Sequence, residues 1–294
     1  MIATDMDKEL KMSTLPNFLV IGAFKGATTS LAKRLSEHPE IFMYPRKETH
    51  FFSIDEEYQK GLDFYKSYFK DHQSEPVIGE ASPSYTRSKQ YPNALKRIVQ
   101  TLPDVKLIYI LRHPIKRIES HWIEARRSGF PIAEFNEAVF ADHEDLVHTS
   151  CYWSELNQFR EFYSDDKILI VFTEDLQEKP HEVLEQCFKF LDVDPAYRSE
   201  NLGNKERPSS GAYIDRHWLS KLRRWPLVAF MIRFAPRPLL KLARPLGRSR
   251  SETRPEWDKQ VLERAIAQIK PDAQRVLEYA GKPPAFWDLD SRSD

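Results

Sequence analysis

The sequence predicts an α/β fold in which a parallel β-sheet carries helices on both faces and is followed by a helical C-terminal extension. Four short runs rich in β-branched residues lie at 17–22, 77–80, 105–112 and 167–172, and such runs are typical of strands inside a parallel sheet. Helical patterns alternate with them at 28–37, 91–101, 114–128, 154–163 and 178–193, and a last helix is expected at 257–279. The repeated order indicates a doubly wound sheet, whose ligands bind beyond the carboxyl ends of the strands.

The length and composition predict one domain. A chain of 294 residues with 41% hydrophobic and 12% aromatic residues can bury one large core or two small ones. We expect a single domain over 16–294, preceded by a flexible N-terminus over 1–15. Proline, arginine and aromatic residues become frequent after residue 200, so we expect a variable basic lid or extension at 201–256.

Charge is balanced over the whole chain but not along it. Lysine plus arginine number 44, as do aspartate plus glutamate, so the net charge does not indicate a nucleic-acid partner. The segment 216–254 nevertheless holds 11 basic residues and one acidic residue, Glu252. One interpretation is a solvated basic helix pair whose apolar residues join the core. The other is a cover over a ligand-binding site, or a surface that makes peripheral contact with a membrane or binds an anionic glycan.

Two features bear on the cellular compartment. Only Cys151 and Cys187 are present, too few for a disulfide framework and consistent with a reducing environment. The first 17 residues lack the apolar core and cleavage pattern of a secretory signal. No apolar run approaches the about 20 residues that span a bilayer. We therefore expect a soluble cytoplasmic protein without a transmembrane segment, and the sequence leaves its oligomeric state open.

The first predicted strand runs into a P-loop-like turn and helix, "FLVIGAFKGATTSL". At such a junction the backbone N–H groups and the dipole of the helix attract an anion. Lys25 adds a positive charge, and Thr28, Thr29 and Ser30 add hydroxyl groups. The turn is not a Walker A loop, because Lys25 precedes Thr28 by three positions. The alternative is a solvated lysine beside an ordinary threonine cap.

Two further polar clusters accompany predicted strands. In "YPRKETHFFS" the side chains of Glu48 and His50, two apart in extended chain, point to the same side. In "LIYILRHPIKRIESHW" Arg112 ends a buried strand, and a helix beginning near Pro114 carries Ser120. Arg112 and Ser120 are suited to the oxygens of one phosphate. Structural roles are the alternatives, including a surface ion pair for Arg112.

Taken together, these segments resemble the sulfotransferases that use 3′-phosphoadenosine 5′-phosphosulfate (PAPS), and most of all a soluble, bacterial-like member of the carbohydrate, or heparan sulfate, branch. The resemblance rests on ordered matches over about 16–194: the turn at 25–31, His38-Pro39, "KETHFF" at 47–52, "GEASPSY" at 79–85, and Arg112 followed eight residues later by Ser120. It continues through 152–176 and a terminal "FWDL" at 286–289.

The resemblance implies a role for each matched residue. Glu48 matches the general base that takes the proton of the acceptor, and Lys25 matches the lysine that stabilises the departing phosphate. His50 matches a histidine beside the base. The residues expected to bind PAPS are Lys25, Gly26, Ala27, Thr28, Thr29 and Ser30 at the phosphosulfate, Arg112 and Ser120 at the 3′-phosphate, and Lys205 and Arg207 in a third loop at 204–211. No metal is expected.

Three positions depart from the family pattern. Ala27 stands where glycine is usual, so its Cβ either tolerates an ordinary φ or narrows the turn. Ala81 and Ser53 stand where heparan sulfate enzymes have lysine and aspartate directed toward the substrate and the catalytic site. These departures argue against a heparan-type polysaccharide acceptor.

The implied reaction is an in-line transfer of a sulfuryl group from PAPS to a hydroxyl or amine of a small metabolite or a carbohydrate. A nucleotide-dependent phosphotransferase is one alternative, although the chain lacks "GK(S/T)", and its third predicted strand ends in Arg112 rather than in an aspartate that could bind magnesium. A non-catalytic adenosine-bisphosphate-binding protein is the other. The presence of both Glu48 and Lys25 argues against it.

Overall fold

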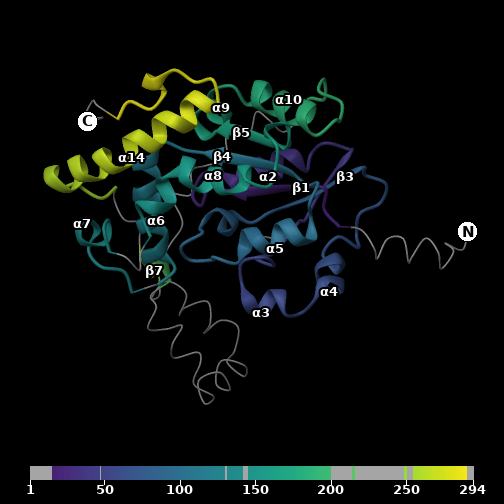
Figure 1. Ribbon diagram of the computed structural model, residues 1–294, viewed down its shortest axis with the longest axis horizontal. Helices are drawn as coiled ribbons and strands as arrows, with labels where there is room; N and C mark the ends of the chain where they lie inside the picture. Colours follow the sequence, from purple (N-terminus) through teal and green to yellow (C-terminus); the bar gives the residue numbers. More distant parts are fainter. Residues whose placement is uncertain are drawn as a thin grey trace, which may run out of the picture.

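The computed structural model describes residues 15–46, 48–129, 131–141, 145–199, 214–215, 248–249 and 254–289. Its centre is a five-stranded sheet with the order β2-β3-β1-β4-β5, in which every neighbouring pair is parallel. The strands are β1 (Phe18–Gly22), β2 (Ile41–Met43), β3 (Val77–Ala81), β4 (Lys106–Leu111) and β5 (Ile168–Phe172). Figure 1 shows this sheet between two layers of helices.

Side chains that alternate along the central strands form two separate hydrophobic cores, one on each face of the sheet. On β1, Phe18 and Val20 face one core, whereas Leu19 and Ile21 face the other, and all four are fully buried. The first core also contains apolar residues of α2 (Thr28–Leu35) and α10 (Pro180–Phe190). Burial on both faces explains why β1 and β4 are continuous apolar runs in the sequence.

The second core lies under the longer helices of the other layer. These are α5 (Ala94–Thr101), α6 (Pro114–Arg127), α8 (Tyr152–Arg160) and α14 (Lys259–Tyr279). The remaining described elements are short: α3 (Asp55–Tyr58), α4 (Leu62–Ser67), α7 (Phe135–Ala138), α9 (Thr173–Glu178), the 3₁₀ turns η1 (Pro83–Thr86), η2 (His148–Ser150), η3 (Asp165–Lys167) and η7 (Pro284–Phe286), and the paired strands β6 (Ile214–Asp215) and β7 (Arg248–Ser249).

The predicted fold class is confirmed. The four predicted strands appear within one residue of their expected ends, and each predicted helix is present. Two differences have physical causes. The edge strand β2 was not predicted, because its three residues are too few for a recognisable pattern. Helix α8 begins at Tyr152 rather than at the predicted residue 154, because Asp272 of α14 accepts hydrogen bonds from the amides of Trp153 and Ser154, each 2.8 Å long.

Arg254 and Trp257 attach the residues that precede α14 to α6. The buried carboxylate of Glu119 accepts a hydrogen bond from Arg254 Nε at 2.7 Å and another from Trp257 Nε1 at 2.9 Å. Near the C-terminus Trp287, 2% exposed, packs against the rings of Tyr152 and Phe172. The C-terminal helix is therefore part of the core. Figure 1 shows α14 in yellow-green, next to α8.

The strand order fixes where a ligand of this sheet would bind. The chain moves from β1 to β3 on one side and to β4 on the other, so the order reverses between β1 and β4. Ligands of open parallel sheets bind at such a reversal, beyond the carboxyl ends of the strands. In the part of the chain that the structure describes, no helix has the length and apolar content needed to cross a membrane.

Candidate functional site: an anion-binding loop beside a glutamate–histidine pair

The loop between β1 and α2 is held by backbone contacts with its neighbours. The amide of Gly26 donates to the carbonyl of Ala23 at 2.8 Å. Thr173 Oγ1, at the end of β5, donates to the carbonyls of Gly26 and Leu111, at 2.9 and 2.8 Å. A Cβ on Gly26 would lie 2.5 Å from the carbonyl oxygen of Ile110. Only glycine therefore fits at position 26 without displacing β4.

Two side chains of this loop project from left-handed backbone. Lys25 has a φ of +66° and Ala27 a φ of +67°, a region that costs an L-residue about 1–2 kcal/mol. Ala27 is the N-cap of α2 and has no side-chain oxygen to satisfy the first amides of the helix. From the sequence we expected an ordinary φ or a narrowed turn at Ala27, and the structure shows a third outcome, a left-handed alanine.

The hydroxyl residues that follow differ in exposure. Thr28 is buried, at 5% exposure, Thr29 is exposed and Ser30 is partly buried. The first turn of α2 contains no acidic residue. A helix N-terminus with a neighbouring lysine and no acidic residue suits a phosphate or sulfate group.

The loop and the end of β4 meet, as the sequence predicts. Arg112 Nη1 donates to the carbonyl of Lys25 at 3.4 Å, and the carbonyl of Arg112 accepts from the Tyr152 hydroxyl at 2.7 Å. Ser120 lies on α6 and is partly exposed. The guanidinium of Arg112 thus lies beside the loop, and Ser120 is two turns along the helix that follows.

Glu48 and His50 form the second half of the site. His50 Nε2 and Glu48 Oε2 are 3.0 Å apart, and the two side chains are 33% and 27% exposed respectively. The other ring nitrogen of His50, Nδ1, lies 3.0 Å from Ser84 Oγ, which in turn is 2.8 Å from Ser53 Oγ. Ser84 therefore fixes the orientation of the imidazole through Nδ1, while the carboxylate of Glu48 at Nε2 remains partly exposed.

A buried carboxylate, Glu80, supports this pair from below. It is fully buried and accepts hydrogen bonds from Ser82 Oγ at 2.7 Å and Tyr85 Oη at 2.5 Å. Burial raises the pKa of Glu80, and the hydroxyl donors only partly oppose that shift. Ser82 also accepts the backbone amide of His50 at 3.2 Å. Glu80 therefore orders the segment on which His50 rests, a role the sequence did not reveal.

Arg87 lies between the two halves. Its guanidinium sits 5.0 Å from the centroid of the Phe24 ring, in the residue before Lys25. Burial lowers the pKa of Arg87, and nearby carboxylates, with Asp145 first and Glu48 among them, partly offset this effect. Arg87 is thus a cation within electrostatic reach of Glu48 and in contact with the anion-binding loop. The sequence analysis did not single it out.

The face of α6 toward the loop is lined by groups with separate roles. Arg117 is fully buried, its Nε donates to Ser150 Oγ at 2.6 Å, and burial lowers its pKa to about 10. His121 packs edge-on against Phe24, with ring centroids 4.7 Å apart. Burial lowers the pKa of His121, and Arg117 adds to that effect, so the imidazole is neutral at pH 7. His121 therefore supports the loop as a neutral ring, and Arg117 Nη1 lies 3.2 Å from His121 Nδ1 behind it.

Lys25 itself contacts a residue that the sequence analysis missed. Its Nζ lies 3.0 Å from Glu124 Oε2. Glu124 is one helical turn beyond Ser120. This i, i+4 spacing could have indicated that Glu124 lies on the same face of the helix as the predicted phosphate contact. The contact joins positions 99 residues apart, so only the fold brings them together.

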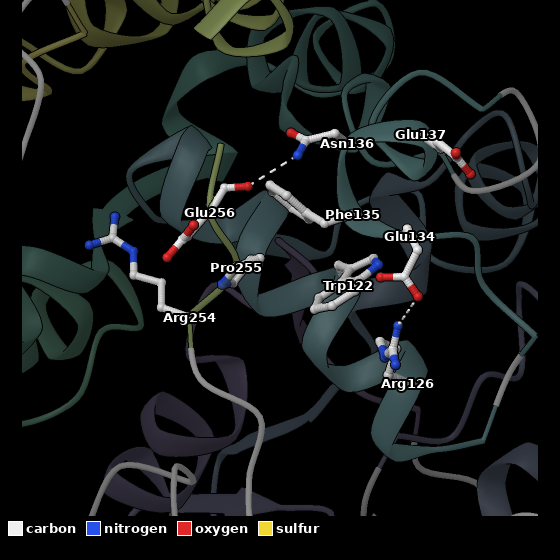
Figure 2. A pocket seen from close by; sticks show the side chains of 9 residues that line it. All are labelled: Trp122, Arg126, Glu134, Phe135, Asn136, Glu137, Arg254, Pro255 and Glu256. Carbon is white, nitrogen blue, oxygen red and sulfur yellow. Dashed lines mark hydrogen bonds and ion pairs between the residues drawn. The ribbon is translucent and has the colours of Figure 1, made fainter. Parts of the chain in front are cut away.

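A groove on the opposite side of α6 is separate from this site. It has a volume of about 510 Å³ and is lined by Trp122, Arg126, Glu134, Phe135, Asn136, Glu137, Arg254, Pro255 and Glu256 (Figure 2). Trp122 is two residues from both Ser120 and Glu124, so it points to roughly the other side of the helix. Its indole donates to the carbonyl of Ala133 at 3.0 Å.

Some predicted positions lie outside the described residues. Lys205 and Arg207, expected in the third binding loop, are among them, as is most of the basic segment 216–254.

Comparison with known sequences identifies the family to which this fold and site belong. The family profile described as "Sulfotransferase domain" matches residues 15–207, more than half of the chain. The chain therefore belongs to the sulfotransferase family, and the family predicted from the sequence is confirmed.

Curated relatives share part of their length with this chain. A 150-residue match, 34% identical, covers 48% of this chain and 31% of the membrane-associated sulfotransferase kil1 of Dictyostelium discoideum. A 199-residue match, 27% identical, covers 64% of this chain and 56% of the mouse heparan sulfate glucosamine 3-O-sulfotransferase 5. A 208-residue match, 29% identical, covers 64% of this chain and 23% of the bovine bifunctional heparan sulfate N-deacetylase/N-sulfotransferase 2.

A solved structure shows the same fold. The sulfotransferase of Alicyclobacillus acidocaldarius superimposes with a TM-score of 0.65 at 22% identity, over 93% of this chain and 99% of the other. The likeness extends beyond the five-stranded sheet.

Proposed function

We propose that this chain transfers a sulfuryl group from PAPS to a hydroxyl or amine of a carbohydrate or a small metabolite. The proposal rests on three groups that lie together where the strand order reverses: the Lys25 side chain, the uncapped start of α2 and the Arg112 guanidinium. Each group suits a phosphate or sulfate, and two of them follow adjacent strands. The residues therefore fit the PAPS that the family uses.

The cosubstrate end of the site would be held by three groups of residues. The amides of Gly26 and Ala27, and the first turn of α2 from Thr28 through Thr29 to Ser30, bind the phosphosulfate. Arg112 and Ser120 bind the 3′-phosphate, and Lys205 and Arg207 add contacts from the loop at 204–211. When bound, PAPS supplies an activated sulfuryl group on a phosphate that can depart.

The residues that act on the reacting atoms would be Glu48, Lys25 and His50. Glu48 accepts the proton of the acceptor while the oxygen or nitrogen of the acceptor bonds to sulfur in line with the bond that breaks. Lys25 neutralises the charge that develops on the departing phosphate oxygen. His50, held by Ser84, donates to Glu48 and orients its carboxylate. The proton ends on Glu48, and no metal is assigned a role.

Two observations bear on the chemical class of the acceptor. Two of the relatives are named for heparan sulfate, which favours a carbohydrate. Ala81 and Ser53 nevertheless replace groups that the heparan sulfate enzymes direct toward the site, and Ser53 here is buried and hydrogen-bonded to Ser84. A short glycan or a small alcohol or amine fits these positions better than a long sulfated polysaccharide.

The test is transfer of label from ³⁵S-PAPS to a panel of oligosaccharides, alcohols and amines, together with calorimetric titration of the product, 3′-phosphoadenosine 5′-phosphate (PAP). Wild-type chain binds PAP and labels at least one acceptor, whereas Lys25→Ala loses turnover and weakens PAP. Loss of activity with a chelator would favour a phosphotransferase. PAP binding without transfer across the panel would favour a non-catalytic binding protein.

We also propose that the basic segment 216–254 contacts the acceptor or an anionic surface. The segment carries a net charge of +10 at neutral pH, and Arg254, at its end, is bound to Glu119 of α6. Replacing Arg223, Arg224 and Arg233 with glutamine should raise the KM for an acidic acceptor at low salt and leave PAP affinity unchanged. An unchanged KM would return the segment to a structural role. A cytoplasmic location is proposed as well, since Cys151 and Cys187 are both free thiols.

A further inference from the structure

Lys25 is held by a carboxylate other than the predicted base. Its ammonium lies 3.0 Å from Glu124 Oε2, whereas the Glu48 carboxylate pairs with His50. The side chains of Lys25 and Glu124 are 23% and 37% exposed. The ion pair is therefore partly exposed, and a ligand bound at the loop can reach it.

Glu124 is ionised at neutral pH. Burial acts to raise its pKa, but the charge and the hydrogen bond of Lys25, followed by the charge of Arg127, lower the pKa overall below the usual 4.5. Ser128 Oγ adds a donor to the other carboxylate oxygen at 3.4 Å. The charge of Lys25 is thus largely neutralised by Glu124 before any ligand arrives.

The position of Glu124 on α6 places it next to the predicted cosubstrate contacts. Ser120 and Glu124 are four residues apart, so they lie on one face of α6 one turn from each other. Ser120 is the expected contact of the 3′-phosphate and Lys25 the expected contact of the phosphosulfate. A negative charge therefore stands where two anionic groups are expected to bind.

We propose that Glu124 is a positioning residue that competes with the phosphosulfate for Lys25, so that PAPS binds by exchanging one anionic partner of this lysine for another. This inference rests on the proposed function. Without ligand, Glu124 keeps the Lys25 side chain extended toward α6 and in reach of the site. With ligand, the ammonium turns to the phosphosulfate and Glu124 is left with Arg127 and Ser128.

Competition predicts a gain of affinity when the competitor loses its charge. In Glu124→Gln, PAP should bind about two- to fivefold more tightly than in wild type at low salt, as expected for loss of one partly exposed ion pair. The gain should shrink as salt screens the charges. In Glu124→Asp, which keeps the negative charge, PAP affinity should stay within about twofold of wild type.

The experiment is calorimetric titration of PAP into wild type, Glu124→Gln, Lys25→Gln and the double variant, each at low and high salt. Competition for Lys25 requires that most of the gain from Glu124→Gln disappears when Lys25 is already glutamine. An equal gain in both backgrounds would mean simple repulsion between Glu124 and the ligand, and would overturn the proposal. So would weaker PAP binding in Glu124→Gln, since Glu124 would then be a required support.

A matched control separates this effect from a general change of charge. Glu185 pairs with Lys189 on α10 at 2.7 Å, so Glu185→Gln removes the same charge from the same kind of pair. It should leave PAP affinity unchanged. If wild-type chain does not bind PAP, the proposed function itself fails. If wild type binds PAP but Glu124→Gln loses turnover with unaltered PAP affinity, Glu124 is a catalytic base and the competition proposal is wrong.

Discussion

The two halves of the site differ in what determines their geometry. The anion-binding loop is shaped by backbone, with left-handed residues at Lys25 and Ala27 and a glycine between them that has no room for a Cβ. The Glu48–His50 pair also contains a left-handed residue, His50, with a φ of +53°, but its geometry depends mainly on side-chain hydrogen bonds that continue to Ser84. We call the first half backbone-built and the second half side-chain-built. The backbone-built half is sensitive to changes of φ, and the side-chain-built half is sensitive to the loss of a hydrogen-bonding group as well.

The same difference decides how well each half can be read from the sequence. The loop has a local signature, a strand followed by a lysine, a glycine and hydroxyl residues within a few positions, so the strand, the turn and the helix could be predicted, whereas the contacts of the loop with Glu124 and Arg87 could not. The Glu48–His50 contact is also local. Its support is not local, because Glu80 and Ser84 lie at least 30 residues further along the chain, and the pairing of β2 with β3 brings the two segments together.

Contacts between distant residues account for the rest of what the sequence did not predict. Glu124 and Lys25 are 99 positions apart, and Arg87 reaches Phe24 because η1, which directly precedes Arg87, packs against β1. Helices such as α3 and α7, with four residues each, complete barely one turn and leave no periodic pattern. The long helices and buried strands were predictable because their apolar spacing is repeated several times.

The largest expected effect tests the side-chain-built half. Glu48→Gln keeps the shape of the residue but cannot accept a proton, so turnover should fall by about 10²- to 10⁴-fold while PAP affinity stays nearly unchanged. Steady-state rates with an acceptor from the panel, together with calorimetry, provide the measurement. Turnover near the wild-type value would remove Glu48 from the mechanism.

A second change breaks the support under the same half. Glu80→Ala leaves the buried hydroxyls of Ser82 and Tyr85 without their acceptor and opens a cavity, so the free energy of unfolding should fall by about 2–4 kcal/mol. Chemical denaturation measures this, with the exposed Glu182→Ala as a control expected to stay within about 0.5 kcal/mol. Equal effects of the two variants would show that the Glu80 network is not a support.

Glu80 also gives that support a pH dependence. Because its pKa is raised in the folded chain, the folded state binds the proton more tightly than the unfolded state. Ionisation of Glu80 therefore costs stability as pH rises from about 4.5 through the folded pKa. Glu80→Gln cannot ionise, so its stability relative to wild type should improve over that window and then level off. A constant difference would show that burial does not raise this pKa.

A third pair of changes separates the two ends of the cosubstrate. Arg112→Ala and Ser120→Ala should weaken PAP, by about tenfold or more for the arginine. They should leave adenosine 5′-phosphosulfate, which lacks the 3′-phosphate, little changed. Parallel calorimetric titrations of both nucleotides make the comparison. An equal loss for both nucleotides would mean that Arg112, which also contacts the carbonyl of Lys25, mainly supports the loop.

The smallest expected effect sharpens the backbone side of the comparison. Ala27→Gly relieves a left-handed alanine and should raise the free energy of unfolding by about 0.5–1 kcal/mol, since glycine adopts a φ of +67° without strain. Thermal unfolding detects the change as a higher Tm. Gly26→Ala is the opposite control, because its Cβ would approach the Ile110 carbonyl to 2.5 Å, and it should lower Tm. A lower Tm in Ala27→Gly would show that position 27 is not strained.

The attachment of Arg254 and Trp257 to Glu119 makes one carboxylate a shared anchor for the start of the C-terminal helix. Glu119 is 5% exposed and accepts a hydrogen bond from each of the two side chains. Helix α14 begins two residues after Trp257 and contacts both α6 and α8. Loss of the Glu119 carboxylate would therefore remove both contacts at once, so α6 and the residues that lead into α14 form one cooperative unit.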